Sequence, residues 1–224
     1  MPLFALALNF SWELVNLVYV VEDKVVMAVI TIWIIIDHGL IHNLVTNAKY
    51  EWEHAPFVAK HIGKIFAVLV LWCSWGIWAF SKWWIDNRIA STPGKAYRGE
   101  VVGAPHMGQL GYWTAQVAQV NLSVFCLVQL LVRQHTGGTS YGIWFCRTMG
   151  SFLPQVVSNG YGYLVWREAY TFWPQPFSVF LLAAQCISDG VYPFFLYKFR
   201  KEEVVLPGGR KVRKGYVEPA KKLE

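Results

Sequence analysis

Charged residues are scarce in this sequence. Only 15% of its 224 residues are Asp, Glu, Lys or Arg, whereas 55% are hydrophobic and 17% are aromatic. A composition this apolar excludes an ordinary soluble domain and is typical of an integral membrane protein. A soluble helical bundle with an unusually large buried core is the less favoured alternative.

Cysteines and metal-binding motifs are also few. All four cysteines fall in apolar segments: Cys73, Cys126, Cys146 and Cys186. This placement predicts reduced packing residues and not a disulfide framework. The sequence has no HExxH motif and no paired CxxC motif, and His38 and His42, four residues apart, lack a clear third ligand. We therefore expect no metal site.

Long apolar segments dominate what is present. Six of them are long enough to cross about 30 Å of hydrocarbon at about 1.5 Å per residue. They cover residues 3–20, 25–45, 62–80, 108–132, 141–166 and 177–197. No Lys or Arg precedes the first segment and no signal-peptidase-like site follows it, so we expect a retained helix there. The predicted fold is all-α, a polytopic transmembrane helix bundle with six spans.

The polar segments indicate one membrane domain, residues 1–200, followed by a basic tail, residues 201–224. Residues 198–224 hold nine of the twenty Lys and Arg residues. A basic excess confined to a tail argues against nucleic acid as a partner, and the positive-inside rule places this tail in the cytosol. The final KKLE resembles a retrieval signal of the endoplasmic reticulum. Residues 81–107, rich in Gly and Pro, are expected to form a surface loop.

Polar residues inside the spans recur at helical spacing, so that they share helix faces. Four such stripes consist of Asn9, Glu13 and Asn16; Gln109, Gln116, Gln119 and Ser123; Arg147, Ser151, Gln155 and Ser158; and Ser178, Gln185, Asp189 and Tyr192. We expect the stripes to converge on the bundle interior as a polar pocket or path. Hydrogen bonds that only join helices are the alternative for any single residue.

Two of these stripes contain carboxylates, Glu13 in "FSWELVNL" and Asp189. A charged, unpaired carboxylate inside a membrane costs several kcal/mol, so both are functional candidates. Their similar expected depths permit a meeting, and burial with mutual repulsion favours the protonated form of at least one. That one is a candidate acid catalyst. Alternatively, both carboxylates pair with Arg147 or a histidine and only hold helices together. Asp37 is expected to support the pocket or a helix crossing.

Five short motifs that follow one another along the sequence are similar to those of a known family. They are "NFSWELV", "EWEHAPFV", "GTSYGIWFCRTMGS", "YLVWREAYTFWPQP" and "ISDGVYPFFLYKF". Together they resemble the small integral-membrane terpene cyclases of fungal indole-diterpene and meroterpenoid pathways, over almost the whole chain up to about Arg200. The resemblance implies that Glu13 of the "WE" motif and Asp189 of the last helix are essential. Relatives usually have seven spans, so it also implies that the span before "WE" is missing or that this chain is natively shorter.

The resemblance further implies cyclisation of a polyprenyl chain joined to an aromatic or indole head group. A carboxylic acid protonates an epoxide or alkene and the resulting carbocation is attacked by neighbouring double bonds. A prenyltransferase and an epoxidase are the implied pathway partners. No redox cofactor is required, and neither a DxDD nor a DDxxD motif is present, so magnesium is not implied.

Carbocations are stabilised by aromatic faces and must be kept from water. The aromatic candidates are Trp12, Tyr112, Trp113, Tyr161, Tyr163 and Tyr192, with packing or interfacial roles as the alternative. Asn9, Asn16, Gln116 and Arg147 are the polar candidates for substrate binding. A small transporter or proton-coupled carrier is the rival function, because it also uses intramembrane carboxylates. A membrane scaffold is the third alternative.

Overall fold

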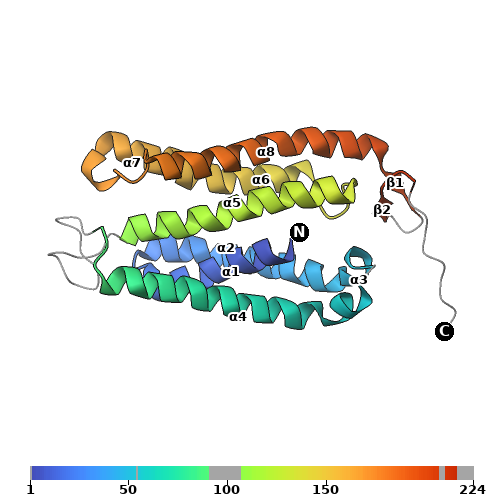
Figure 1. The fold of residues 1–224 in the computed structure, drawn as a ribbon, viewed down its shortest axis with the longest axis horizontal. Coiled ribbons are helices and arrows are strands. Elements are labelled where there is room, and N and C mark those ends of the chain that lie inside the picture. Colours follow the sequence, from blue (N-terminus) through green and yellow to red (C-terminus); the bar gives the residue numbers. More distant parts are fainter. Residues whose placement is uncertain (1, 54, 91–106, 207–209, 216–224) are drawn as a thin grey trace.

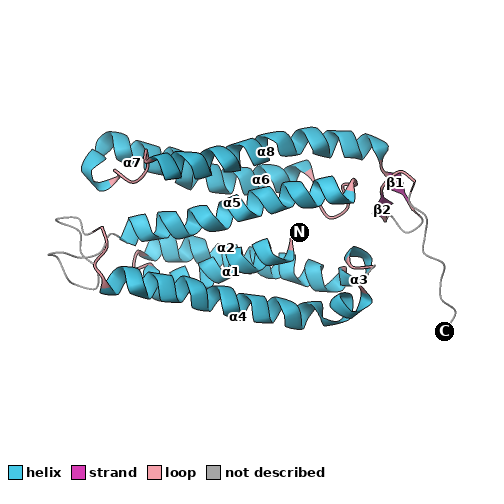
Figure 2. Cartoon of the chain, viewed as in Figure 1, coloured by secondary structure: helices cyan, strands magenta, loops and turns pink. Residues whose placement is uncertain are grey.

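A computed structural model describes residues 2–53, 55–90, 107–206 and 210–215. Long helices lie side by side in one bundle (Figure 1) and almost all of the described chain is helical (Figure 2). The long helices are α1 (Leu3–Val15), α2 (Lys24–Thr46), α4 (Pro56–Asp86), α5 (Met107–Arg133), α6 (Tyr141–Phe152) and α8 (Pro176–Glu202). The short elements are α3 (Ala48–Glu51), α7 (Asn159–Val165), a 3-10 turn (Arg167–Ala169), two π-helical segments, and strands β1 (Val204–Val205) and β2 (Lys211–Val212).

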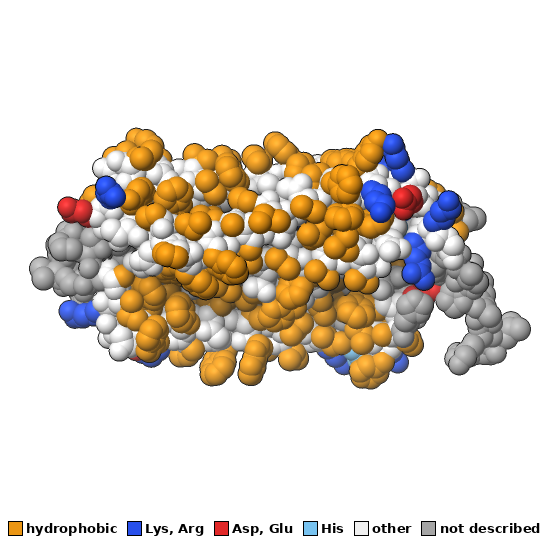
Figure 3. Space-filling view, turned by 45° about the horizontal axis from the view of Figure 1, so that its top comes forward, with side chains coloured by type: hydrophobic (Ala, Val, Ile, Leu, Met, Phe, Trp, Pro, Cys, Tyr) orange, Lys and Arg blue, Asp and Glu red, His pale blue; other side chains and the backbone are white. Residues whose placement is uncertain are grey.

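The outer surface of this bundle is suited to a bilayer. Hydrophobic side chains cover its middle and charged side chains gather toward its two ends (Figure 3). Among the described residues, five helices are long and apolar enough to cross a membrane. The fifth expected span, residues 141–166, is helical from Tyr141 to Val165 but is divided into three pieces. The predicted all-α transmembrane bundle is confirmed, with six as an approximate number of spans.

Helix α1 lies at the centre of the bundle. In the span that it begins, 44% of residues are buried, compared with 11% in the span of α2. Small side chains on α1 allow neighbouring helices to approach closely, and Ala5 and Ala7 are completely buried. Ser11 Oγ also donates a hydrogen bond to the Val70 carbonyl of α4 at 3.0 Å. The central position of α1 means that its polar stripe faces other helices and not lipid.

A π-helical segment, Leu153–Ser158, interrupts the fifth predicted span. Pro154 lies in it and cannot donate a helix hydrogen bond, which explains the local change of winding. The wider turn changes the phase of every side chain that follows. Ser151 and Gln155 are therefore buried as the stripe predicted, whereas Ser158 is exposed. The prediction that Ser158 faces the interior is wrong for this reason.

The predicted loop at residues 81–107 begins too early. Helix α4 continues to Asp86, and Lys82 donates to Asp86 at 2.6 Å, one helical turn away. Such pairs stabilise exposed helix ends. The part of the predicted loop at 91–106 lies outside the described residues.

The start of the basic tail folds against one end of the bundle. Strands β1 and β2 pair antiparallel, and Arg210 forms an ion pair with Glu53 while Lys211 pairs with Glu203 at 2.8 Å. Burial alone would raise the pKa of Glu203, but hydrogen bonds from Lys211 and Thr136 outweigh it and the pKa is lowered. The KKLE sequence lies outside the described residues.

Candidate active site

Glu13 lies in the interior of the bundle. Its side chain is 3% exposed. Asn9, one turn earlier on α1, donates through Nδ2 to Glu13 Oε1 at 3.0 Å and to Asp37 Oδ2 of α2 at 3.2 Å. In the described part of the chain, Glu13 forms no ion pair and its Oε2 has no hydrogen-bond partner. An acid with one free oxygen and no ion-pair partner is suited to hold a proton.

Asp37, which the sequence predicts to support the pocket or a helix crossing, lies where α2 meets α1 and accepts the hydrogen bond from Asn9. We expect Asp37→Leu to lower turnover by about 10–100-fold, because loss of an acceptor for a buried donor costs about 1–3 kcal/mol and leaves Asn9 free to turn away from Glu13. Asp37→Asn keeps an acceptor for Asn9 and is expected to stay within about tenfold of wild type. Steady-state turnover in membranes measures both variants. Equal turnover of Asp37→Leu and wild type would contradict this role.

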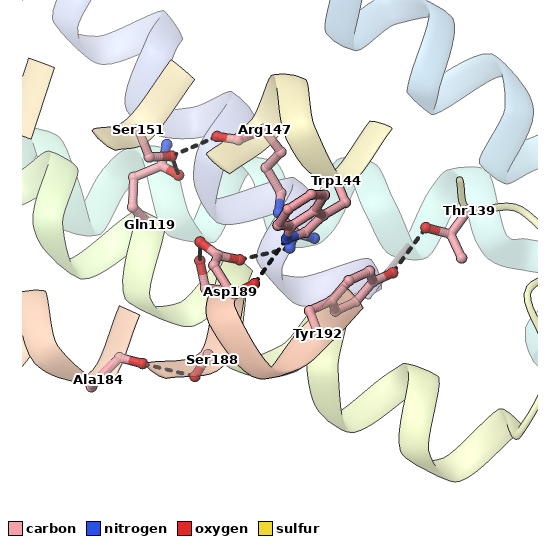
Figure 4. A network of polar contacts seen from close by, with 10 residues as sticks. Gln119, Thr139, Trp144, Arg147, Ser151, Ala184, Ser188, Asp189 and Tyr192 are labelled. Atoms are coloured by element: carbon pink, nitrogen blue, oxygen red, sulfur yellow. Dashed lines mark hydrogen bonds and ion pairs between the residues drawn. The ribbon is translucent and has the colours of Figure 1, made fainter. Parts of the chain in front are cut away.

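Asp189 is the centre of a second polar group (Figure 4). Arg147 of α6 donates to Asp189 Oδ1 at 2.7 Å, and Ser123 Oγ of α5 donates to Oδ2 at 2.8 Å. The guanidinium of Arg147 also lies 4.9 Å from the centre of the Tyr192 ring. Both carboxylate oxygens accept hydrogen bonds, one of them from a cation, so this site is built for an ionised Asp189. The sequence offers this pairing with Arg147 as the alternative in which Asp189 holds helices together.

The backbone at Asp189 is also adapted to this site. A regular helix would place a hydrogen bond from residue 193 to the Asp189 carbonyl, but residue 193 is proline and has no N–H. Trp144 Nε1 of α6 donates to this carbonyl instead, at 2.8 Å. Pro193 and Trp144 therefore hold α6 and α8 together beside the carboxylate.

A chain of hydrogen bonds connects the two groups, although no direct hydrogen bond joins Glu13 and Asp189 among the described residues. Gln119 Nε2 of α5 donates to Asn9 Oδ1 at 3.2 Å, and Ser151 Oγ donates to Gln119 Oε1 at 2.6 Å. Ser151 also contacts the Arg147 carbonyl at 3.0 Å. The expected polar path is thus present, but the two carboxylates occupy different ends of it.

Other polar residues of the predicted stripes form hydrogen bonds inside the bundle. Gln116 Nε2 donates to Gln185 Oε1 at 3.4 Å, and both residues are buried. Tyr112 shares a hydrogen bond with Ser178, and its ring packs 5.0 Å from Phe172. The hydroxyl groups of Tyr192 and Thr139 lie 2.8 Å apart.

The remaining candidates differ in their placement. Asn16 is buried and donates to the Trp12 carbonyl at 2.9 Å, while Trp12 Nε1 donates to Thr114 at 2.9 Å. Trp113 is half-buried and stacks on Phe177 with centroids 5.8 Å apart. Trp12 therefore joins α1 to α5 and Trp113 joins α5 to α8, whereas the hydrogen bond of Asn16 is local.

Tyr161 and Tyr163 do not contribute to an interior aromatic wall. Tyr161 is 68% exposed on the outer surface, and Tyr163 packs on Trp173 and Arg167 near the end of α7. The prediction of an inward-facing Tyr161 is wrong because the π-helical segment before it changes the helix phase. The prediction that all cysteines are packing residues is also wrong in part, since Cys146 and Cys186 are exposed while Cys73 and Cys126 are buried.

Potential metal ligands do not cluster in the described part of the chain. No cluster of three or more His, Cys, Asp or Glu residues that could hold a metal ion occurs in the described ranges. His38 and His42 are both exposed on α2. The candidate site therefore consists of Glu13, Asp189 and the polar residues that connect them.

Comparison with known proteins identifies a family that covers most of the chain. The family model described as Pyr4-like transmembrane terpene cyclases matches residues 1–202. Terpene cyclase ascF of Acremonium egyptiacum is 34% identical over 212 residues, 95% of this chain and 75% of its own length. Terpene cyclase dpchB of Colletotrichum higginsianum is 32% identical, covering 96% and 80%, and terpene cyclase ltmB of Epichloe festucae var. lolii is 30% identical, covering 86% and 75%. No solved structure matches the chain.

Proposed function

The chain belongs to the Pyr4-like transmembrane terpene cyclases, and from this membership we propose that it cyclises a polyprenylated aromatic or indole substrate by protonating an epoxide or alkene. The position of Glu13 is the observation that carries the proposal, because this carboxyl group is buried, has one unpartnered oxygen and forms no ion pair in the described chain. A carboxylic acid in such an environment stays protonated and can donate to a substrate oxygen.

In the proposed reaction, the proton of Glu13 passes to the epoxide oxygen while the adjacent carbon–oxygen bond breaks. The bond electrons remain on oxygen, which becomes a hydroxyl group, and a tertiary carbocation is left on the prenyl chain. Double bonds then attack in sequence, and the last cation loses a proton to a base; a proton returned to the Glu13 carboxylate restores the acid for the next turnover. One proton is gained and one is lost, so the product is an isomer of the substrate and no redox cofactor or metal enters the step.

Asp189 has a different role in this proposal. Its carboxylate, ion-paired with Arg147, supplies fixed negative charge that stabilises positive charge on the prenyl chain. The indole of Trp144, which lines a groove beside Asp189, adds cation–π stabilisation, whereas the Tyr192 ring faces the Arg147 guanidinium. The acid and the cation-stabilising anion are thus kept apart by the Asn9–Gln119–Ser151 path, which prevents Arg147 from pairing with Glu13.

The cellular setting is also proposed. The basic residues that follow α8 support a cytosolic tail, and the two-lysine motif within that tail supports the endoplasmic reticulum membrane. A prenyltransferase and an epoxidase are the classes of enzyme that must supply this substrate. Physical association with them is not required, because a prenylated substrate can diffuse in the bilayer.

The test is conversion of an epoxidised prenyl-aromatic substrate by membranes that contain the protein. Isomers of unchanged mass are expected, and they must be absent from matched membranes without it. If the substrate is recovered unchanged, the cyclase proposal is wrong for that substrate class. Gradient-driven accumulation of a solute in vesicles, without conversion, would instead support the carrier alternative.

A further inference from the structure

A groove lies between α6 and α8, on the outer side of the Asp189 group. Its volume is about 250 Å³. Its lining includes Trp144, Phe152, Gln185, Cys186, Asp189 and Gly190. Cys186 and Gly190 are exposed, whereas Gln185 is 4% exposed and Asp189 is 3% exposed. The groove therefore begins at the outer surface and ends at polar residues of the bundle interior.

The position of the groove determines what can enter it. Cys186 and Gly190 lie near the middle of the 27-residue helix α8, far from either end. An opening at this depth faces the hydrocarbon of the bilayer and not water. Only a lipid-soluble chain can reach it directly.

Gly190 helps to keep the groove open. A Cβ atom built on Gly190 meets no heavy atom within 4 Å, so the space beside it is empty. The opposite wall is fixed by Trp144, whose indole is held by the Asp189 carbonyl. The hydroxyl group of Thr148, which also lines the groove, has no hydrogen-bond partner in the described chain.

We propose that this groove is the lateral entrance for the isoprenoid chain of the substrate, which passes from the bilayer between α6 and α8 to reach Asp189. This inference rests on the proposed cyclase function. The groove is smaller than the roughly 300–1,000 Å³ that encloses a whole drug-sized ligand, so it holds part of a long chain while the rest stays in the bilayer or the interior.

An isoprenoid chain fits the groove better than a phospholipid acyl chain. The inner end carries an ionised carboxylate and the side wall carries an indole ring. A saturated acyl chain gains nothing from either group. A chain that becomes positively charged during the reaction is stabilised by both.

Gly190→Leu tests the entrance by filling it. We expect kcat/KM to fall by about tenfold or more, the order expected when extra volume excludes a ligand. Leucine favours helix over glycine, and the space is empty, so the variant should accumulate in membranes as wild type does. The matched control is Gly150→Leu on α6, where a Cβ also meets no atom within 4 Å but which does not line the groove. Unchanged kcat/KM in both variants would overturn the inference while leaving the cyclase function intact.

A second measurement does not depend on turnover. A substrate analogue with a diazirine on its prenyl chain is irradiated in membranes that contain the wild-type protein, and the labelled peptides are mapped. Labels on α6 and α8 near Phe152 and Cys186, suppressed by excess unlabelled substrate and absent in Gly190→Leu, support the entrance. Labels confined to other helices overturn it. Labels at the groove that excess substrate does not suppress identify it as an ordinary lipid contact and also overturn it.

Discussion

Glu13→Gln is expected to abolish cyclisation, with a loss of at least about 10²–10⁴-fold, the range for removal of a general acid. The amide has the same shape, and Asn9 Nδ2 can still donate to the oxygen that replaces Glu13 Oε1. The protein should therefore fold and enter the membrane normally. Product formation per amount of membrane-embedded protein measures the effect.

The matched control for Glu13→Gln is Glu203→Gln, the same chemical change in the ion-paired group at the end of α8. This variant should keep wild-type turnover, because Glu203 lies outside the candidate site. Turnover by Glu13→Gln at the rate of Glu203→Gln would show that the acid lies elsewhere.

Asp189→Asn is expected to lose both activity and stability. The change removes the proposed anion and leaves Arg147, whose side chain is only 10% exposed, as a buried charge without its partner. Breaking a buried pair in this way costs about 3–5 kcal/mol in the free energy of unfolding. Thermal denaturation in detergent measures the stability, and product formation measures the activity.

The double variant Asp189→Asn with Arg147→Met separates the two effects. Removal of the unpaired charge should restore much of the thermal stability. Activity should not return, because the double variant still lacks negative charge beside the prenyl chain. Recovery of wild-type turnover in the double variant would show that Asp189 serves only to neutralise Arg147.

Helical spacing predicted much of this site because the face of each helix that contacts lipid must be apolar, so polar side chains gather on the face toward the bundle interior. Asn9, Glu13, Gln116 and Asp189 are all buried, as their stripes indicated. Spacing gives the phase of a side chain around its own helix, and that is enough to decide whether it faces inward. The fold class and the choice of the two carboxylates follow from this information.

The partners of these residues could not be predicted in the same way. Which helix lies opposite a stripe depends on packing across the bundle, so spacing could not decide whether Arg147 pairs with Asp189 or Glu13. Asp37 appeared as one polar residue in an apolar helix, and only the crossing of α1 and α2 places it against Asn9. Each of these pairings joins segments that are distant in the sequence.

Local backbone changes limited the prediction further. The predicted stripe on the fifth span assumes one regular helix, but a π-helical segment lies within it. Side chains after that segment point in other directions than regular helical spacing predicts. Pro193 predictably leaves the Asp189 carbonyl without its helix hydrogen bond. The sequence does not show that Trp144 supplies the replacement donor. The hairpin after α8 likewise depends on ion pairs with residues far away in the sequence.

The central claim is that Glu13 donates the proton that opens the substrate and starts an isomerisation. The most direct test is a mass measurement on products formed from an epoxide whose oxygen carries a heavy isotope, with wild-type and Glu13→Gln membranes compared. We predict a wild-type product of unchanged mass that retains all of the label, and no such product from Glu13→Gln. A product that has lost the label or gained water, or equal yields from the two proteins, would contradict this mechanism.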